Sequence, residues 1–202
     1  AYDIGAARVT RLFSGVLDAP AVLAGYSRLV IDLNREEDAA GLLPVMSDGH
    51  AIPGNRNADL AERMIRFYHP YHHAIGVLLD RMTSPFLLSL HSFTPILESD
   101  PAQKRPWDVG ILYNEDDRAA RMAIPMLEAA GLIVGDQLPY SGRLLNATMN
   151  RHAEANAQCG QTKLLIPSFH FVEQRDQQAC ARTSQWMTQR HGATVDVGLL
   201  QR

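Results

Sequence analysis

The sequence predicts an α/β fold with a mixed, largely parallel central sheet. Short apolar runs that suit buried strands alternate with segments of helical periodicity along the 202 residues, which is typical of helices covering a sheet. The length suits a single domain, and the hydrophobic content of 46% is ordinary for a globular protein. In such sheets ligands bind outside the carboxyl ends of strands. Polar residues that follow apolar runs are therefore the first candidates for a functional site.

The first eighty residues are predicted to begin with a helix, because apolar residues recur there at helical spacing. A long loop rich in Gly, Pro and Asn follows two short apolar runs, and loops of that length are often functional. The predicted elements are a helix at 2–17, strands at 21–24 and 28–33, the loop at 36–58, and a helix at 58–82 interrupted near Pro70.

The rest of the chain continues the alternation of strands and helices. The run FLLSLHSF is strongly apolar, and Gly131 is positioned to end a helix. The predicted elements are strands at 86–93 and 107–114, a helix at 115–130, a short strand within 132–137, a helix at 144–159, at least one strand within 163–174, and a terminal helix at 176–191.

Composition excludes some classes of function. The net charge of about −3 provides no basic face for nucleic acid, and no apolar run has the length of a transmembrane helix. The two cysteines, Cys159 and Cys180, lack the spacing of metal ligands and suit idle thiols in a reducing compartment. With no signal peptide at the amino end as given, we expect a cytoplasmic protein that does not bind membranes.

Asp32, Asn34 and Arg35 follow the apolar run Leu29–Ile31. Arg35 offers a planar fork of donors that matches a carboxylate, and Asn34 supplies a donor and an acceptor. They could clamp a substrate carboxylate while Asp32 orients Arg35. A structural ion pair at the end of a strand is the other interpretation, and the spacing alone leaves both open.

His91 and Glu173 also follow or end apolar runs. His91 is a candidate metal ligand, since neutral imidazole is a usual donor to zinc, and a buried structural histidine is the alternative. Glu173 could be a general base acting on a metal-bound water, or one member of an exposed charge pair with Arg175.

The order of these motifs resembles that of the zinc carboxypeptidase-like hydrolases. Those proteins carry a D-x-N-R motif that binds the substrate carboxylate, then H-S-[YF] with a zinc-ligating histidine, then E-x-R-D with the catalytic base. The chain has Asp32 to Arg35, His91 to Phe93 and Glu173 to Asp176 in that order. The resemblance implies that Arg28 stabilises the oxyanion, and that the fold is a three-layer αβα sandwich of the carboxypeptidase-like type.

Within that superfamily the sequence is similar to the N-formylglutamate amidohydrolases. The similar stretches are AYDIGAARV, SRLVIDLNRE, SDGHAIPGN, YHPYH, LHSFTP, RPWDVGILYNEDDR and PYSG. The family implies a zinc-dependent hydrolase that releases formate and glutamate from N-formylglutamate in one route of histidine degradation. The acidic substrate needs further cations, and the candidates for its second carboxylate are Arg56, Arg118 and Arg143.

The resemblance also implies that residues 1–202 form a single catalytic domain without its amino-terminal strand and first metal-ligand motif, because the family's D-H-A-x-N motif precedes the stretch with which the chain opens. Two alternatives remain open. One is a hydrolase of another N-acyl amino acid or small peptide, and the other is a non-catalytic relative that only binds carboxylates.

His69 and His73 have i, i+4 spacing that could bind a metal, although Pro70 lies between them, and His50 could contact substrate from the long loop.

Overall fold

The computed structural model describes residues 2–83, 85–143, 146–154, 164–165, 168–172 and 195–198. Within them, a seven-stranded sheet has the order β1-β9-β4-β8-β5-β6, with β7 also paired to β4, and β2 and β3 form a separate hairpin. The strands are β1 Ala21–Leu23, β2 Met46–Ser47, β3 His50–Ala51, β4 Phe86–Phe93, β5 Val109–Leu112, β6 Val134–Asp136, β7 Leu164–Leu165, β8 Ser168–Val172 and β9 Val195–Gly198.

The large sheet is mixed, with one antiparallel pair between β5 and β8 and parallel pairs elsewhere. Because β8 is parallel to β4, the strands β5 and β6 run opposite to β4. The carboxyl end of β4 therefore lies at the same edge as the amino end of β5. The α/β class predicted from the sequence is confirmed.

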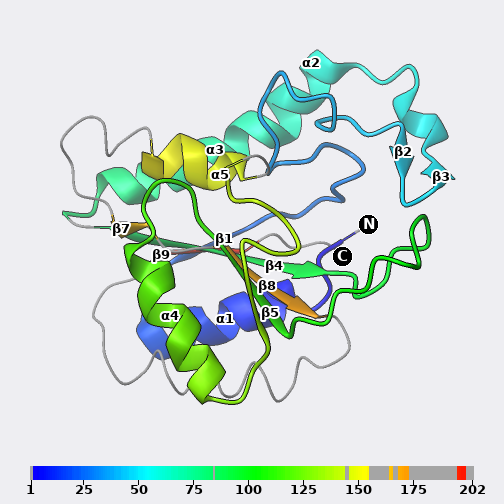
Figure 1. The fold of residues 1–202 in the computed structure, drawn as a ribbon. Coiled ribbons are helices and arrows are strands. Elements are labelled where there is room, and N and C mark those ends of the chain that lie inside the picture. Colours follow the sequence, from blue (N-terminus) through cyan, green and yellow to red (C-terminus); the bar gives the residue numbers. More distant parts are fainter. Residues whose placement is uncertain are drawn as a thin grey trace.

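Helices lie on both sides of this sheet in Figure 1, with α1 and α4 on one side and α3 and α5 on the other. Within the described residues, no helix is long and apolar enough to cross a bilayer. The helical elements are α1 Ala6–Leu17, the 3-10 turn η1 Pro53–Asn55, α2 Leu60–Arg63, the π-helical turn η2 Met64–Tyr68, α3 His69–Asp80, α4 Arg118–Ala129, α5 Ala147–Met149 and the π-helical turn η3 Asn150–Glu154.

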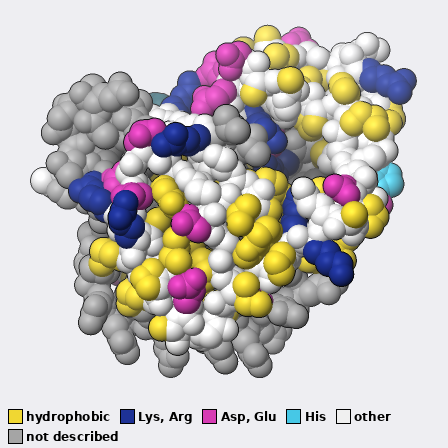
Figure 2. All heavy atoms as spheres, viewed as in Figure 1, with side chains coloured by type: hydrophobic (Ala, Val, Ile, Leu, Met, Phe, Trp, Pro, Cys, Tyr) yellow, Lys and Arg dark blue, Asp and Glu magenta, His cyan; other side chains and the backbone are white. Residues whose placement is uncertain are grey.

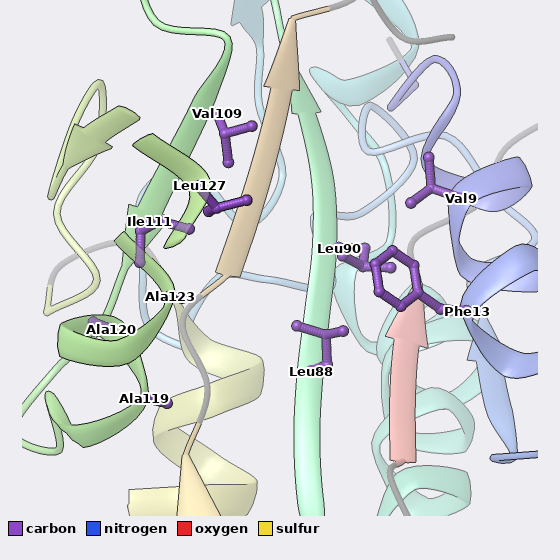
Figure 3. Close-up of a cluster of buried hydrophobic side chains, with 10 residues drawn as sticks. All are labelled: Val9, Phe13, Leu88, Leu90, Val109, Ile111, Ala119, Ala120, Ala123 and Leu127. Carbon is purple, nitrogen blue, oxygen red and sulfur yellow. The ribbon is translucent and has the colours of Figure 1, made fainter. Parts of the chain in front are cut away.

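Alternating residues of β4 pack against two hydrophobic clusters, because successive side chains of a strand point to opposite faces. Leu88 and Leu90 belong to the cluster drawn in Figure 3, which joins β4 and β5 to α1 and α4. Leu87 belongs to a second cluster that includes residues of α3 and of the segment 28–35. Ser89 and His91 share the face of Leu87, so they point toward this second side.

The predicted strand at 28–33 is wrong, because the segment turns instead of pairing. Val30 donates to the Ser27 carbonyl over 2.7 Å, which closes a turn. The Leu29 carbonyl accepts from the Asn55 side chain, and the Val30 carbonyl accepts from Arg63. Side chains thus satisfy the backbone groups that a neighbouring strand would otherwise satisfy. Of the apolar residues in this run, Ile31 and Leu33 are buried, whereas Leu29 and Val30 are only partly buried.

Other predictions differ from the structure mainly at their limits. The helix expected to be interrupted near Pro70 changes to a π-helical turn at Met64–Tyr68, just before that proline. The loop at 36–58 contains the β2–β3 hairpin, and β9 was not expected. Of the helix predicted at 144–159, the described part forms α5 and η3. The helix predicted at 176–191 lies outside the described residues.

Candidate active site

His91 lies in the second half of β4, and its side chain is fully buried. Its Nδ1 is 2.7 Å from an oxygen of Asp3. A carboxylate only accepts, so Nδ1 carries a proton and donates it to Asp3. The Ser89 hydroxyl and the Asn34 amide lie 3.1 and 3.4 Å from Nε2, and both can donate to it. The contacts therefore agree on one tautomer of His91.

Asp3 joins His91 to Arg28. It is 6% exposed, and its second oxygen is 3.4 Å from Arg28 Nη1. The other Nη of Arg28 is 2.9 Å from Asp32. Burial opposes the charged form of Arg28, but Asp32 and Asp3 outweigh it and hold its pKa above the ordinary value. Arg28 is thus a fixed cation between two carboxylates.

Sequence reasoning missed the contact between Asp3 and His91. Asp3 stands in the short stretch AYDIGA, and its burial, at 6% exposure, is what requires a partner for the carboxylate. The partner is 88 residues away, and no local pattern indicates it.

Asn34 is buried and held in place from several directions. Its backbone N–H donates to the Asp32 side chain over 3.0 Å, forming a local turn. Its side-chain oxygen accepts from the backbone of Thr148 over 3.1 Å, and its carbonyl accepts from Ala147. With the oxygen occupied by a donor, the amide nitrogen is directed at His91.

Arg35 is about one-third exposed, and its Nε lies 3.5 Å from Asp32. Its backbone carbonyl accepts from the Tyr68 hydroxyl over 2.8 Å. Burial is the main cause that raises the pKa of the Tyr68 hydroxyl to about 12, so the hydroxyl stays protonated and can donate. Arg35 therefore has a fixed backbone and a guanidinium at the surface. We name the six residues Asp3, Arg28, Asp32, Asn34, Arg35 and His91 the His91 cluster.

Arg118 and Arg143, two of the candidates for a second carboxylate, are exposed. They pair with the nearby Asp116 and Glu115. Since β5 runs opposite to β4, the loop and helix that follow β5 begin at the edge of the sheet opposite to the carboxyl end of β4. This places Arg118, at the start of α4, at that opposite edge. The third candidate, Arg56, is exposed beside η1.

The remaining candidates are placed as follows. His69 and His73 are exposed on α3, whereas His72 between them is buried. His50 is exposed and lies 2.9 Å from Glu98. Glu173 lies outside the described residues.

His91 is the metal ligand predicted from the sequence, and its contacts can be compared with that role. His91 fits, because its tautomer is fixed by a carboxylate in the way that metal-ligating histidines commonly are. No group of three or more His, Cys, Asp or Glu side chains that could hold a metal occurs within the described residues.

Comparisons with known proteins found a similar solved structure and a matching family. The crystal structure of the gene product Atu2144 from Agrobacterium tumefaciens is similar, with a TM-score of 0.78 and 25% sequence identity, over 93% of this chain and 75% of that chain. No curated protein matched. A family model described as N-formylglutamate amidohydrolase matches residues 1–164, which include every residue of the His91 cluster. The chain therefore belongs to the N-formylglutamate amidohydrolase family.

Proposed function

We propose that this chain hydrolyses N-formyl-L-glutamate to formate and L-glutamate with the help of a divalent metal ion, expected to be zinc. The observation that carries the proposal is the contact between His91 and Asn34, which are 57 residues apart in sequence. The contact lies on the face of β4 that points toward the second hydrophobic cluster. The family match supports the amide-hydrolysing class. We extend the proposal to the three-layer αβα architecture of carboxypeptidase-like hydrolases, to a place in histidine degradation and to a cytoplasmic location.

His91 would hold the metal through Nε2, with Asp3 fixing the ring. When bound, such an ion polarises the substrate carbonyl and lowers the pKa of a water molecule. The side chains of the His91 cluster would bind the substrate and stabilise the charge that develops on it. Arg35 and Asn34 would hold the α-carboxylate, so that binding energy fixes the formamide in place. Arg28 would stabilise the charge that develops on the formyl oxygen.

Glu173 would move the proton in this proposal. The water oxygen forms a bond to the formyl carbon, the C–N bond breaks, and the proton from water goes to the leaving nitrogen. Glu173 directly follows β8, and β8 is the parallel neighbour of β4 in register with His91. A carboxylate at that point of the sequence suits a general base near the metal. Should Glu173 prove dispensable, His170 is the next candidate.

The test measures metal content and formate release on the full-length protein. We expect His91→Ala to lose bound metal and formate release, while His73→Ala, which changes an exposed histidine on α3, keeps both. His91→Gln is a second variant that leaves a polar partner for the buried Asp3. Formate release by the unsubstituted protein, together with unchanged metal content in both His91 variants, would remove His91 from the ligand set.

Other outcomes separate the alternatives. Release of a different acyl group, with N-formylglutamate left intact, would favour a hydrolase of another N-acyl amino acid or a small peptide. Binding of glutamate without hydrolysis of any acyl amino acid would favour the carboxylate-binding relative.

A further inference from the structure

Arg105 is the one arginine that is buried among the described residues, at 7% exposure. It lies in the loop between β4 and β5. Its Nη1 donates to the Thr94 carbonyl over 3.2 Å and to the Tyr140 hydroxyl over 2.8 Å. The guanidinium also lies 5.1 Å from the centre of the Tyr140 ring. These contacts hold one side of the guanidinium firmly.

The other edge of the guanidinium is poorly satisfied. Nε is buried and has no hydrogen-bond partner, and Nη2 has only the Gln103 amide oxygen at 3.5 Å. Within the described residues no carboxylate forms an ion pair with Arg105, whereas Arg28 and Arg35 both have one. Burying a charge is costly unless it is paired. The edge formed by Nε and Nη2 is also the edge that binds a carboxylate through two parallel hydrogen bonds.

Gln103 is the group that covers this edge, and it is exposed. Its amide is neutral and its hydrogen bond is long. A carboxylate would form shorter, charge-assisted hydrogen bonds in its place. The exposed side chain can move aside without disturbing the core.

Arg105 lies in the loop that leaves the carboxyl end of β4, the end of the strand nearer to His91. Thr94 directly follows β4 and is three residues beyond His91, about 10 Å away at about 3.3 Å per residue. An extended N-formylglutamate separates its formyl carbon from its side-chain carboxyl carbon by about 6 Å, given bonds of about 1.3–1.5 Å. The remaining gap is within reach of an arginine side chain. Figure 2 shows Lys and Arg side chains in a hollow on the side of the molecule that carries β2 and β3.

We propose that Arg105 binds the side-chain carboxylate of glutamate through Nε and Nη2, and so sets the preference for an acidic acyl amino acid. The proposal rests on the proposed function for the reaction, but not for the binding of the carboxylate. It assigns to Arg105 the role that Arg56, Arg118 and Arg143 were expected to fill. Tyr140 and Thr94 would position the guanidinium.

The test compares N-formyl-L-glutamate with N-formyl-L-glutamine, which has nearly the same shape but lacks the second charge. We expect Arg105→Gln to lower kcat/KM for N-formylglutamate by roughly ten- to a hundredfold, mainly through KM. N-formylglutamine should change by less than about threefold, since a neutral amide gains little from the cation. Arg105→Lys keeps the charge and should show an intermediate loss. Arg121→Gln, which changes an exposed arginine on α4, should leave both substrates unaffected.

A purely structural role gives a different result. If Arg105 only fastens the loop to Tyr140, both substrates lose equally in Arg105→Gln and the Tm falls. That outcome would overturn the proposal.

A binding measurement keeps the two proposals separable. Calorimetry with L-glutamate and L-glutamine needs no turnover. If Arg105→Gln loses the preference for glutamate over glutamine, the Arg105 site is supported. If the unsubstituted protein also releases no formate, the proposed amidohydrolase activity is rejected. If the protein releases formate and Arg105→Gln keeps the preference for the acidic substrate, the Arg105 site is rejected and the proposed amidohydrolase activity is still supported.

Discussion

Asp3 determines the orientation of two other functional candidates, His91 and Arg28. Its carboxylate accepts from the His91 ring at 2.7 Å and faces Arg28 at 3.4 Å. The first contact sets the tautomer of His91, and the second fixes the position of a cation. Single residues of this kind matter more for a site than their own reactivity suggests, because they act through the groups they hold.

Arg35 gives a prediction at the same scale. Arg35→Lys keeps the charge but loses the planar two-point contact with a carboxylate. Losing one charge-assisted hydrogen bond costs about 1.5–3 kcal/mol, so kcat/KM for N-formylglutamate should fall roughly ten- to a hundredfold. A neutral formamide without carboxylates should be affected much less. Kinetics with both substrates, alongside a thermal melt, check this. If kcat/KM falls equally for both substrates and the Tm is lower, Arg35 forms a structural ion pair with Asp32 and does not bind substrate.

At the scale of elements, three separate helical elements hold the segment from Leu33 to Arg35. The Leu33 carbonyl lies 3.1 Å from the ring of His72 in α3. The Asn34 carbonyl accepts from the backbone N–H of Ala147, the first residue of α5. The Arg35 carbonyl accepts from the hydroxyl of Tyr68 in η2. Among the described strands none pairs with this segment, and contacts from these helical elements hold its backbone instead. The side chains of Asn34 and Arg35 are thereby positioned by elements far away in the sequence.

Two glycines give a matched prediction for the packing of elements. A Cβ on Gly110 in β5 would lie 2.3 Å from the Leu138 carbonyl oxygen, whereas one on Gly76 in α3 would have no atom within 4 Å. Gly110→Ala should therefore destabilise the protein by about 1–3 kcal/mol, since backbone must shift. Gly76→Ala should stabilise it by about 0.5–1 kcal/mol, because alanine favours a helix interior. Urea unfolding of both variants measures this, and equal effects would contradict the close packing of Leu138 on β5.

At the scale of the whole molecule, the sheet divides the interior into two hydrophobic clusters, and the His91 cluster lies on the side of the second. His72 is buried on this side, between the Leu33 carbonyl and His152, whose Nε2 is 3.0 Å from His72 Nδ1. Because the carbonyl only accepts, His72 Nε2 donates and Nδ1 accepts from His152. A proton added to His72 Nδ1 would meet the N–H of His152.

The stability of the molecule should therefore depend on pH. Burial, followed by the influence of His152, lowers the pKa of His72 from 6.5 to about 3. Between these values the unfolded chain binds the proton and the folded chain does not, so the free energy of unfolding falls as the pH falls. The slope from this residue is at most about 1.4 kcal/mol per pH unit. Urea unfolding between pH 7 and pH 4 measures it.

The control for this prediction is the exposed His73. We expect His72→Gln to be less stable at pH 7 but to have a shallower dependence on pH, while His73→Gln keeps the original slope. A slope that does not change in His72→Gln would show that other groups cause the acid sensitivity.

The sequence by itself determined the class of the fold and the identity of most candidates. Periodicity of apolar residues is a local property, so β4 and the helix around residues 6–17 could be located from it. The motifs around Asn34, Arg35 and His91 could be found because each is a short, contiguous pattern. The apolar run at 28–33 indicated burial, which the structure confirms for Ile31 and Leu33 but not in full for Leu29 and Val30.

Only the tertiary structure decided which of these residues meet. The segment 28–33 is not a strand because Asn55 and Arg63 satisfy its carbonyls, and neither contact can be read from local sequence. The reversal of β5 relative to β4 puts Arg118 at the edge of the sheet opposite to the carboxyl end of β4, whereas Arg105 lies at the same edge as that end. Asp3 reaches His91 across 88 residues. The physical reason is common to all three cases: hydrogen bonds and ion pairs depend on distance in space, and distance along the chain predicts it only within an element.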